Sequence, residues 1–357
     1  MKTFYKKYLL ALLLALPAGI YVQSQQLIAN VEARNYSSLN GKWQIIIDPF
    51  NAGAGNWKPI WKDQTPAGKT DFYEYKFDST VTLNVPGDWN SQNRELKYYE
   101  GTVWYKKTVN YQKKKNKKIF LYFSGVSYEC EVYVNNEKAG SHEGSFTAFQ
   151  FDVTDQIKDG NNSIIIRVNN TRRVDGIPAM NFDWWNYGGI TRDVLLAEMP
   201  STFISDYKVQ LAKNDLKSIT GFVQLNGADL SQQIKINIPE ANLQTTVNTD
   251  ANGKATFTIP VKALHYWSPE DPKRYKVLIT SSNDAVTDEI GFRTIETKGA
   301  DILLNGKSIF LRGICLHEED PFIPGRPRSA SDIKMLLTLA KELNCNFDER
   351  DHTPIMS

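Results

Sequence analysis

Residues 128–137 read Tyr-Glu-Cys-Glu-Val-Tyr-Val-Asn-Asn-Glu, and this stretch decides the fold of the first part of the chain. Its side chains alternate in character, which predicts a β-strand with one buried and one exposed face. The buried set is Tyr128, Cys130, Val132 and Val134; the exposed set is Glu129, Glu131 and Tyr133. The pair Asn135-Asn136 that follows favours a hairpin turn. The stretch therefore predicts an antiparallel sheet packed on a core.

The same pattern of short strands and turn signals extends outward from about Val31 to Ala197. Residues 119–123 and 163–168 are further β-rich runs, and helical periodicity is almost absent. Two antiparallel sheets in one domain are typical of a β-sandwich. We expect a jelly roll over residues 25–200.

A second β-rich segment occupies residues 201–297. Candidate strands lie at Gly221 to Leu225, Ile234 to Ile238, Ala255 to Ile259 and Tyr275 to Thr280. This length and pattern suit an immunoglobulin-like β-sandwich. Of the eight tryptophans, only Trp267 falls here, so the segment is interpreted as a spacer rather than a site.

The pattern changes at residue 298. Residues 302–304 and 309–311 flank the turn Asn305-Gly306, and a helix with one apolar face follows. That face is formed by Ile333, Leu336, Leu337, Ala340 and Leu343. Ser331 suits the start of the helix, Asn344 suits its end, and residues 345–347 form a further candidate strand. Strand, loop, helix and strand predict the start of a parallel α/β domain over residues 298–357.

The first 24 residues have the features of a secretory signal peptide. Lys2, Lys6 and Lys7 precede the apolar run 8–16, and Val22 and Ser24 stand at positions −3 and −1 of a cut before Gln25. About ten apolar residues are too few to cross a bilayer, which needs about 20. We expect a secreted or periplasmic protein without a membrane anchor after cleavage.

Composition excludes several functions of the mature chain. The net charge of the 357 residues is +2, and it becomes −1 without the three leader lysines, so a nucleic-acid partner is not expected. The basic run 113–118 is interpreted as a solvated loop. Cys130, Cys315 and Cys345 have the spacing of neither a disulfide framework nor a zinc site. We expect no metal and no cofactor.

Several local motifs occur in a fixed order along the chain. They are Val-Pro-Gly-Asp-Trp at 85–89, Gly-Thr-Val-Trp-Tyr at 101–105, Tyr-Val-Asn at 133–135, Trp-Asn-Tyr-Gly-Gly-Ile-Thr-Arg at 185–192, Trp-Ser-Pro-Glu at 267–270, Gly-Phe-Arg at 291–293, Leu-Asn-Gly-Lys at 304–307, Leu-Arg-Gly at 311–313 and His-Glu at 317–318. Together they resemble glycoside hydrolase family 2, the family of β-galactosidases, β-glucuronidases and β-mannosidases. The resemblance implies a (β/α)8 barrel after the two β domains.

The resemblance also implies retaining hydrolysis of terminal β-galactosides or β-glucuronides by two glutamates, with carbohydrate as the partner. In the family both glutamates come from later barrel strands, so no catalytic residue is assigned in this chain. Neighbouring carboxylates at 318–320 project in different directions and do not supply the pair. His317 matches a family histidine that contacts the sugar and is the one candidate substrate-binding residue. The alternative is a loop histidine hydrogen-bonded to backbone.

The sequence departs from the family pattern after Phe347. Family members continue with Val-Arg and, three residues later, Tyr-Pro-His-Asn-Glu. Some of the codon combinations that can encode His352 to Ser357 also encode Tyr-Pro-His-Asn-Glu when they are read from the third base of each codon. This favours the hypothesis that one base was lost after Phe347. On this hypothesis the chain is truncated early in the barrel, is inactive alone and packs poorly after residue 298. The alternatives are a non-catalytic carbohydrate-binding protein and a nonfunctional frameshifted fragment.

The aromatic stretch at 184–189 reads Trp-Trp-Asn-Tyr-Gly-Gly and permits two interpretations. Aromatic faces stack on sugar rings, and they are also common large fillers of a β core. On that second ground we expect packing in the core or at a domain interface, with a sugar-binding surface as the alternative.

Overall fold

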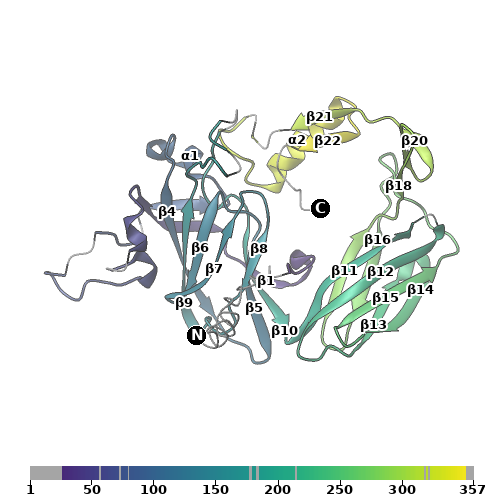
Figure 1. Cartoon of the computed structure of the whole chain (residues 1–357), viewed down its shortest axis with the longest axis horizontal. Coiled ribbons are helices and arrows are strands. Elements are labelled where there is room, and N and C mark those ends of the chain that lie inside the picture. Colours follow the sequence, from purple (N-terminus) through teal and green to yellow (C-terminus); the bar gives the residue numbers. More distant parts are fainter. Residues whose placement is uncertain are drawn as a thin grey trace, which may run out of the picture.

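The computed structural model describes residues 26–350, apart from 56–57, 72–73, 79, 177–178, 182–184, 214, 317–318, 321 and the side chains of 348–350. The predicted leader lies outside the described residues. Two β-sandwiches follow one another along the chain, and a smaller segment with one α-helix comes after them (Figure 1). The expected mostly β fold is confirmed.

The first sandwich has an antiparallel six-stranded sheet of order β3-β2-β4-β9-β6-β7 and an antiparallel four-stranded sheet of order β1-β10-β5-β8. The strands are β1 Asn35–Ser38, β2 Gly41–Asp48, β3 Thr82–Val85, β4 Thr102–Tyr111, β5 Lys117–Phe123, β6 Glu129–Val134, β7 Glu137–Glu143, β8 Phe149–Asp152, β9 Gly160–Asn169 and β10 Val194–Pro200. The helix α1, Trp89–Gln92, follows β3. Short 3-10 helices occur at Val31–Ala33, Ala52–Ala54, Ile60–Lys62 and Arg94–Leu96.

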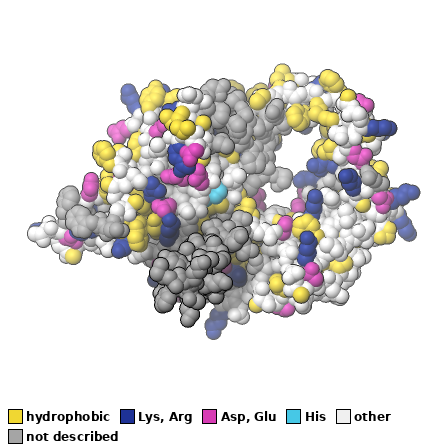
Figure 2. All heavy atoms as spheres, viewed as in Figure 1, with side chains coloured by type: hydrophobic (Ala, Val, Ile, Leu, Met, Phe, Trp, Pro, Cys, Tyr) yellow, Lys and Arg dark blue, Asp and Glu magenta, His cyan; other side chains and the backbone are white. Residues whose placement is uncertain are grey.

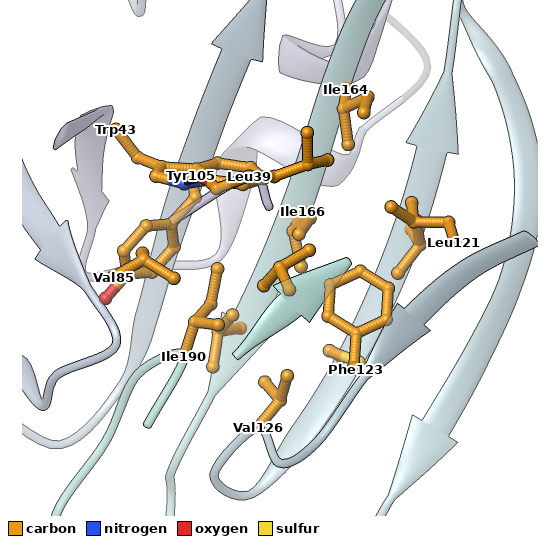
Figure 3. Packing of buried hydrophobic residues seen from close by; sticks show 14 of the residues in the cluster. Leu39, Trp43, Val85, Tyr105, Leu121, Phe123, Val126, Ile164, Ile166 and Ile190 are labelled. Atoms are coloured by element: carbon orange, nitrogen blue, oxygen red, sulfur yellow. Dashed lines mark hydrogen bonds between the residues drawn. The ribbon is translucent and has the colours of Figure 1, made fainter. Parts of the chain in front are cut away.

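The core of this sandwich lies between its two sheets. Apolar side chains from both sheets, such as Trp43, Leu121 and Ile166, are buried there and point toward one another (Figure 3). The alternation predicted for β6 is confirmed, because Cys130 and Val132 belong to this core. These contacts across the two sheets account for most of the burial that holds the domain together.

The prediction that Tyr133 is exposed is wrong. It lies on the outer face of β6, as the alternation requires, yet it is buried in a second apolar cluster. Its ring stacks on Trp61 with centroids 5.2 Å apart, and the ring of Trp104 lies 6.3 Å away between centroids. The segment between β2 and β3 supplies Trp61 and therefore covers part of a face that is otherwise solvated.

The second sandwich pairs a sheet of order β11-β12-β15 with one of order β14-β13-β16-β17. Its strands are β11 Thr202–Ala212, β12 Asp215–Gly227, β13 Gln233–Ile238, β14 Leu243–Asn248, β15 Lys254–Pro260, β16 Tyr275–Thr280 and β17 Ala285–Ile290, with a 3-10 helix at Pro239–Ala241. Every second side chain of β15, beginning with Ala255, is buried. The four strands predicted here are confirmed.

The last segment begins with the small sheet β18 Ile295–Lys298, β19 Asp301–Leu304 and β20 Lys307–Ile309. Asn305 and Gly306 have φ angles of 52° and 78°, which confirms the predicted turn. The strand predicted at 309–311 is shifted, because β20 ends at Ile309.

A parallel β–α–β unit completes the described chain. The strand β21, Gly313–Leu316, pairs in parallel with β22, Phe347–Arg350, and α2, Ala330–Glu342, connects them. Ser329, and not Ser331, caps α2, because Ser329 and Asp332 form a reciprocal capping box. Asn344 has a φ of 59°, as predicted for the residue that ends the helix. No helix in the described part of the chain is both long and apolar enough to span a membrane.

Candidate functional site

The candidate site is the place where the loop between β21 and α2 meets the jelly roll. This loop contacts the end of the jelly roll that carries α1 (Figure 1). The loop also follows the carboxyl end of a parallel strand, which is where α/β domains place their functional groups. The site therefore combines two parts of the chain that are more than 130 residues apart in sequence.

Asp88 organises the jelly-roll side of this junction. Its side chain is fully buried, and its Oδ1 atom accepts the backbone N–H of Ser91 at 2.6 Å, which caps α1. Its Oδ2 atom accepts the Ser91 hydroxyl at 2.8 Å and the backbone N–H of Arg326 at 3.5 Å. One carboxylate thus serves both a local helix cap and a contact with the distant loop.

Arg326 is the buried charge of the junction, with only 6% of its surface exposed. Its Nη1 atom donates to the Thr191 hydroxyl at 3.3 Å, and its guanidinium lies 5.2 Å from the ring centroid of Phe146. Burial, with a smaller contribution from the nearby Arg192, lowers the pKa of Arg326, and Asp88 opposes this shift. Asp88 therefore offsets only part of the cost of burying this charge.

Backbone geometry brings the loop close to α1. Gly325 has a φ of +111°, and a Cβ atom there would lie 2.5 Å from Ser91 Oγ and 2.8 Å from Asp88 Oδ2. A side chain at this position would thus meet both strain and a clash. Arg328 adds a 2.7 Å hydrogen bond from Nη2 to Ser91 Oγ.

Two carboxylates in the described part of the loop already have partners. Glu319 Oε1 accepts the hydroxyl of Tyr187 at 3.2 Å, and burial together with this carboxylate raises the pKa of Tyr187. Asp320 Oδ1 accepts the N–H groups of Phe322 and Ile323 at 2.8 and 2.9 Å. These contacts are structural and do not form the pair of facing carboxyl groups that glycoside hydrolysis requires.

Aromatic side chains lie exposed beside this junction. Trp185 is 38% exposed and therefore does not pack in the core, whereas Tyr187 contacts the neighbouring loop, which agrees with the expected packing at a domain interface. Tyr98 is 78% exposed and lies 5.5 Å from Trp185 between ring centroids, and Trp185 lies 6.5 Å from Tyr187. We call Tyr98, Trp185 and Tyr187 the aromatic platform. Trp184 lies outside the described residues.

Buried and partly buried asparagines hold the platform's loops in place. Asn170 and Asn186 exchange hydrogen bonds, each amide donating to the other residue's carbonyl at 3.0 and 2.8 Å. Asn170 Oδ1 also accepts the Gly101 N–H, and Asn90 Oδ1 accepts the Gly188 N–H. Sequence reasoning missed these asparagines, because only the fold brings three separate loops together.

His317, the predicted substrate-binding residue, lies outside the described residues together with Glu318. Its role stays a prediction. Within the described ranges, no three His, Cys, Asp or Glu side chains are grouped as a metal ion would require. The three cysteines are free thiols, and Cys130 is buried in the core as predicted.

Comparison with known families decides the classification. Residues 36–200 match the sugar binding domain of glycosyl hydrolases family 2, and residues 202–293 match a second domain of glycosyl hydrolases family 2. The chain belongs to glycoside hydrolase family 2. The family resemblance of the sequence motifs is thereby confirmed.

Individual relatives in the family are similar over most of this chain. A protein of Formosa agariphila assigned as a β-glucuronidase is 34% identical over 76% of the chain and 35% of its own length. A β-galactosidase of Clostridium acetobutylicum is 27% identical over 90% of the chain and 38% of its own length. The chain thus spans between about a third and two fifths of these two relatives.

Solved structures show the same fold. The β-glucuronidase of Ruminococcus gnavus superposes with a TM-score of 0.75 at 24% identity, over 89% of this chain and 54% of that one. The β-glucuronidase of Bifidobacterium dentium, solved with coumarin-3-O-glucuronide, gives a TM-score of 0.73 at 24% identity, over 88% and 56%. At this level of identity the likeness concerns the fold.

Proposed function

We propose that this chain is the front portion of a retaining exo-β-glycosidase that acts on terminal β-galactosides or β-glucuronides. The observation that carries the proposal is the order of two family domains over residues 36–293, followed by a parallel β–α–β unit. Relatives assigned as β-glucuronidase and β-galactosidase support both sugars.

The segment after residue 298 is proposed to be the start of the catalytic barrel. A (β/α)8 barrel is built from parallel strands linked by helices, and β21, α2 and β22 have this connection. The apolar face of α2 supports the same proposal, because Ile333 and Leu343 are 38% and 69% exposed. Such a face is suited to packing against further elements of a barrel.

We propose that the 357-residue chain by itself does not hydrolyse glycosides. Retaining hydrolysis needs a protonated carboxyl group and a carboxylate about 5 to 5.5 Å apart on opposite sides of the scissile bond. In the described part of the last segment, Glu319, Asp320 and Asp332 instead bind Tyr187, loop N–H groups and the start of α2. The family's two glutamates are expected on later barrel strands.

The protein is further proposed to be exported, as its first 24 residues suggest. Secretion or a periplasmic location places the enzyme where it meets extracellular glycosides. N-terminal sequencing of the protein purified from its source cell tests this proposal, with Gln25 expected as the first residue. A mature protein that begins at Met1 would contradict it.

DNA beyond codon 347 provides the test of the glycosidase proposal. We expect the barrel sequence to continue in another frame, including an Asn-Glu pair for the acid. The continuous protein, expressed after the frame is restored, should hydrolyse an aryl β-galactoside or an aryl β-glucuronide. The absence of barrel sequence in every frame, or a folded continuous protein that hydrolyses neither compound, would contradict the proposal.

A further inference from the structure

The first described residues of the chain, 26–34, precede β1 and bind the second sandwich as well as the first. Ala29 donates its backbone N–H to the Ser205 carbonyl at 2.9 Å, and the Asn30 side-chain amide donates to the Tyr207 hydroxyl at 3.1 Å. Ser205 and Tyr207 both belong to β11 of the second sandwich. We call residues 26–34 the clasp, because they hold together two domains that follow them in the chain.

The clasp also packs against the jelly roll. Ile28 and Val31 are each 3% exposed, and they belong to an apolar cluster with Phe120 of β5 and Phe203 of β11. The rings of Phe120 and Phe203 meet edge to face, with centroids 5.7 Å apart. Gln150, which is buried in the jelly roll, accepts the Ile28 N–H at 3.2 Å. The clasp therefore completes one apolar cluster to which both sandwiches contribute.

Arg34, the last residue of the clasp, adds a polar connection to the second sandwich. Its Nη1 atom donates to Asp284 Oδ2 at 2.6 Å, and its Nη2 atom donates to the Ile204 carbonyl at 2.6 Å. The covalent link between the sandwiches is short, since only Ser201 separates β10 from β11. A single link of this kind permits hinge motion, and a second, separate connection fixes the angle between the domains.

The two sandwiches do not touch everywhere around this joint. An open cleft with a volume of about 470 Å³ lies beside the clasp, and Arg34, Lys117, Glu198 and Asp284 are among its lining residues. Domains of one chain move relative to each other unless a large or specific interface prevents it. We therefore expect the angle between the sandwiches to depend on the clasp.

The last segment runs from the second sandwich back to the jelly roll (Figure 1). At its start, Asn305 donates from Nδ2 to the Trp267 carbonyl at 3.0 Å and accepts the Thr294 N–H at 3.1 Å. At its far end, the Arg326 backbone contacts Asp88. An opening lies between the last segment and the second sandwich in Figure 2. The three parts therefore form a ring, with the clasp at one junction and the loop contact at another.

We propose that the clasp controls the docking of the loop at 322–329 on the jelly roll, because it sets the angle between the two sandwiches. The loop binds a surface of its own chain, so its docking depends on the effective concentration that the rest of the ring provides. A fixed angle keeps the loop close to Asp88, whereas a loose joint spreads it over many positions. The device does not depend on the proposed glycosidase activity.

Coupling of this kind acts in both directions. If an intact clasp favours a docked loop, then a docked loop favours an intact clasp by the same factor, because linkage between two equilibria is reciprocal. A clasp that only stabilised the jelly roll would lack this property. The two directions therefore give two independent measurements of one coupling.

Hydrogen exchange of the 357-residue protein, read by mass spectrometry, tests the first direction. The variant Asn30→Gly/Arg34→Met opens the clasp: Gly accepts the φ of 52° at position 30 and removes the amide, and Met keeps a long side chain without the charge. Exchange at 322–329 should rise at least about fivefold, the lower end of the usual range for coupled sites. The control is Asp48→Ala, which destabilises the jelly roll without touching the clasp and should leave this exchange as in wild type.

The variant Gly325→Ala tests the second direction and leaves the clasp residues unchanged, so it keeps the proposal testable if the double variant does not fold. Exchange in the peptide 26–34 should rise at least about fivefold, while Gly299→Ala, at a glycine with nothing within 4 Å, should match wild type.

Three results would overturn the proposal. The first is an open clasp, seen as raised exchange at 26–34 in the double variant, with wild-type exchange at 322–329. The second is a detached loop in Gly325→Ala with a clasp as protected as in wild type. The third is an equal rise at 322–329 in Asp48→Ala and in the clasp variant, because the effect would then be a general loss of stability.

Discussion

The buried carboxylate of Asp88 touches the backbone of Arg326, 238 residues later in the chain, with 3.5 Å between Oδ2 and the amide nitrogen. The same carboxylate caps α1 through Ser91. Any change that separates the loop of Arg326 from the jelly roll therefore leaves a buried acid with fewer donors. This junction is the basis of the first prediction.

Gly325→Ala should detach the loop from the jelly roll. The new Cβ atom would meet Ser91 and Asp88 at a backbone angle that L-residues avoid. Hydrogen exchange at residues 322–329 should rise at least about tenfold while the β core keeps its protection. Gly299→Ala is the control, since Gly299 also has a positive φ but has nothing within 4 Å. Equal exchange in the two variants would contradict the prediction.

Asp48→Ala should destabilise the jelly roll by about 3 kcal/mol, because it leaves several buried donors without an acceptor. Asp48 accepts the Trp104 indole N–H at 3.0 Å and the N–H groups of Ala52 and Gly53, each at 2.9 Å. Urea unfolding measures the change. The control is Glu137→Ala, at an exposed position, which should change the free energy of unfolding by less than about 0.5 kcal/mol. A similar loss of stability in Asp48→Ala and Glu137→Ala would contradict the prediction.

Arg34 and Asp284 should couple the two sandwiches. Their 2.6 Å ion pair is buried, with the side chains 3% and 10% exposed. A double-mutant cycle with Arg34→Met and Asp284→Asn should give a coupling of at least about 1.5 kcal/mol. The exposed pair Arg274–Glu289, at 2.9 Å, should give less than about 0.5 kcal/mol in the same cycle. Equal couplings for the two pairs would contradict the prediction.

His142 should make part of the jelly roll's stability depend on pH. Burial lowers the pKa of His142 below 6.5, against smaller opposing effects of Gly144 and Glu143, and its ring stacks on Phe149 with centroids 4.0 Å apart. Well above pH 6.5, as at pH 7.5, His142 is almost entirely neutral in both the folded and the unfolded state. As the pH falls from 6.5 through the folded pKa, the unfolded state binds the proton first and stability is lost.

The variant His142→Phe keeps a ring on Phe149 and removes the titrating group. Urea unfolding at pH 7.5 and pH 5.5 should show a smaller loss of stability in this variant than in wild type. All other titrating groups are shared by the two proteins, so their contributions cancel in the comparison. Parallel losses in wild type and His142→Phe would show that His142 does not contribute.

Local signals predicted the parts of the fold that depend on neighbouring residues. The alternation in residues 128–134 and the asparagines at 135–136 and 305 are local, and the structure has the strand and both turns. The predicted cap of α2 was two residues off, because serines stand at both 329 and 331 and only Ser329 has Asp332 at the position that a capping box requires.

Contacts between residues far apart in the chain could not be predicted from the sequence. Tyr133 is buried because Trp61, from the segment between β2 and β3, covers the outer face of β6. Arg326 would be expected in solvent by its type, yet Thr191 and Phe146 enclose it. The exposed position of Trp185 depends on where three loops of the jelly roll meet, which no pattern within residues 184–189 reveals.

The most direct test of the account measures turnover by the chain itself. Purified 357-residue protein, free of host glycosidases, is titrated with nitrophenyl β-galactoside and nitrophenyl β-glucuronide while free nitrophenol is recorded. The account predicts that no nitrophenol is released above the protein-free control. Release of nitrophenol that grows with the concentration of the pure chain would contradict it.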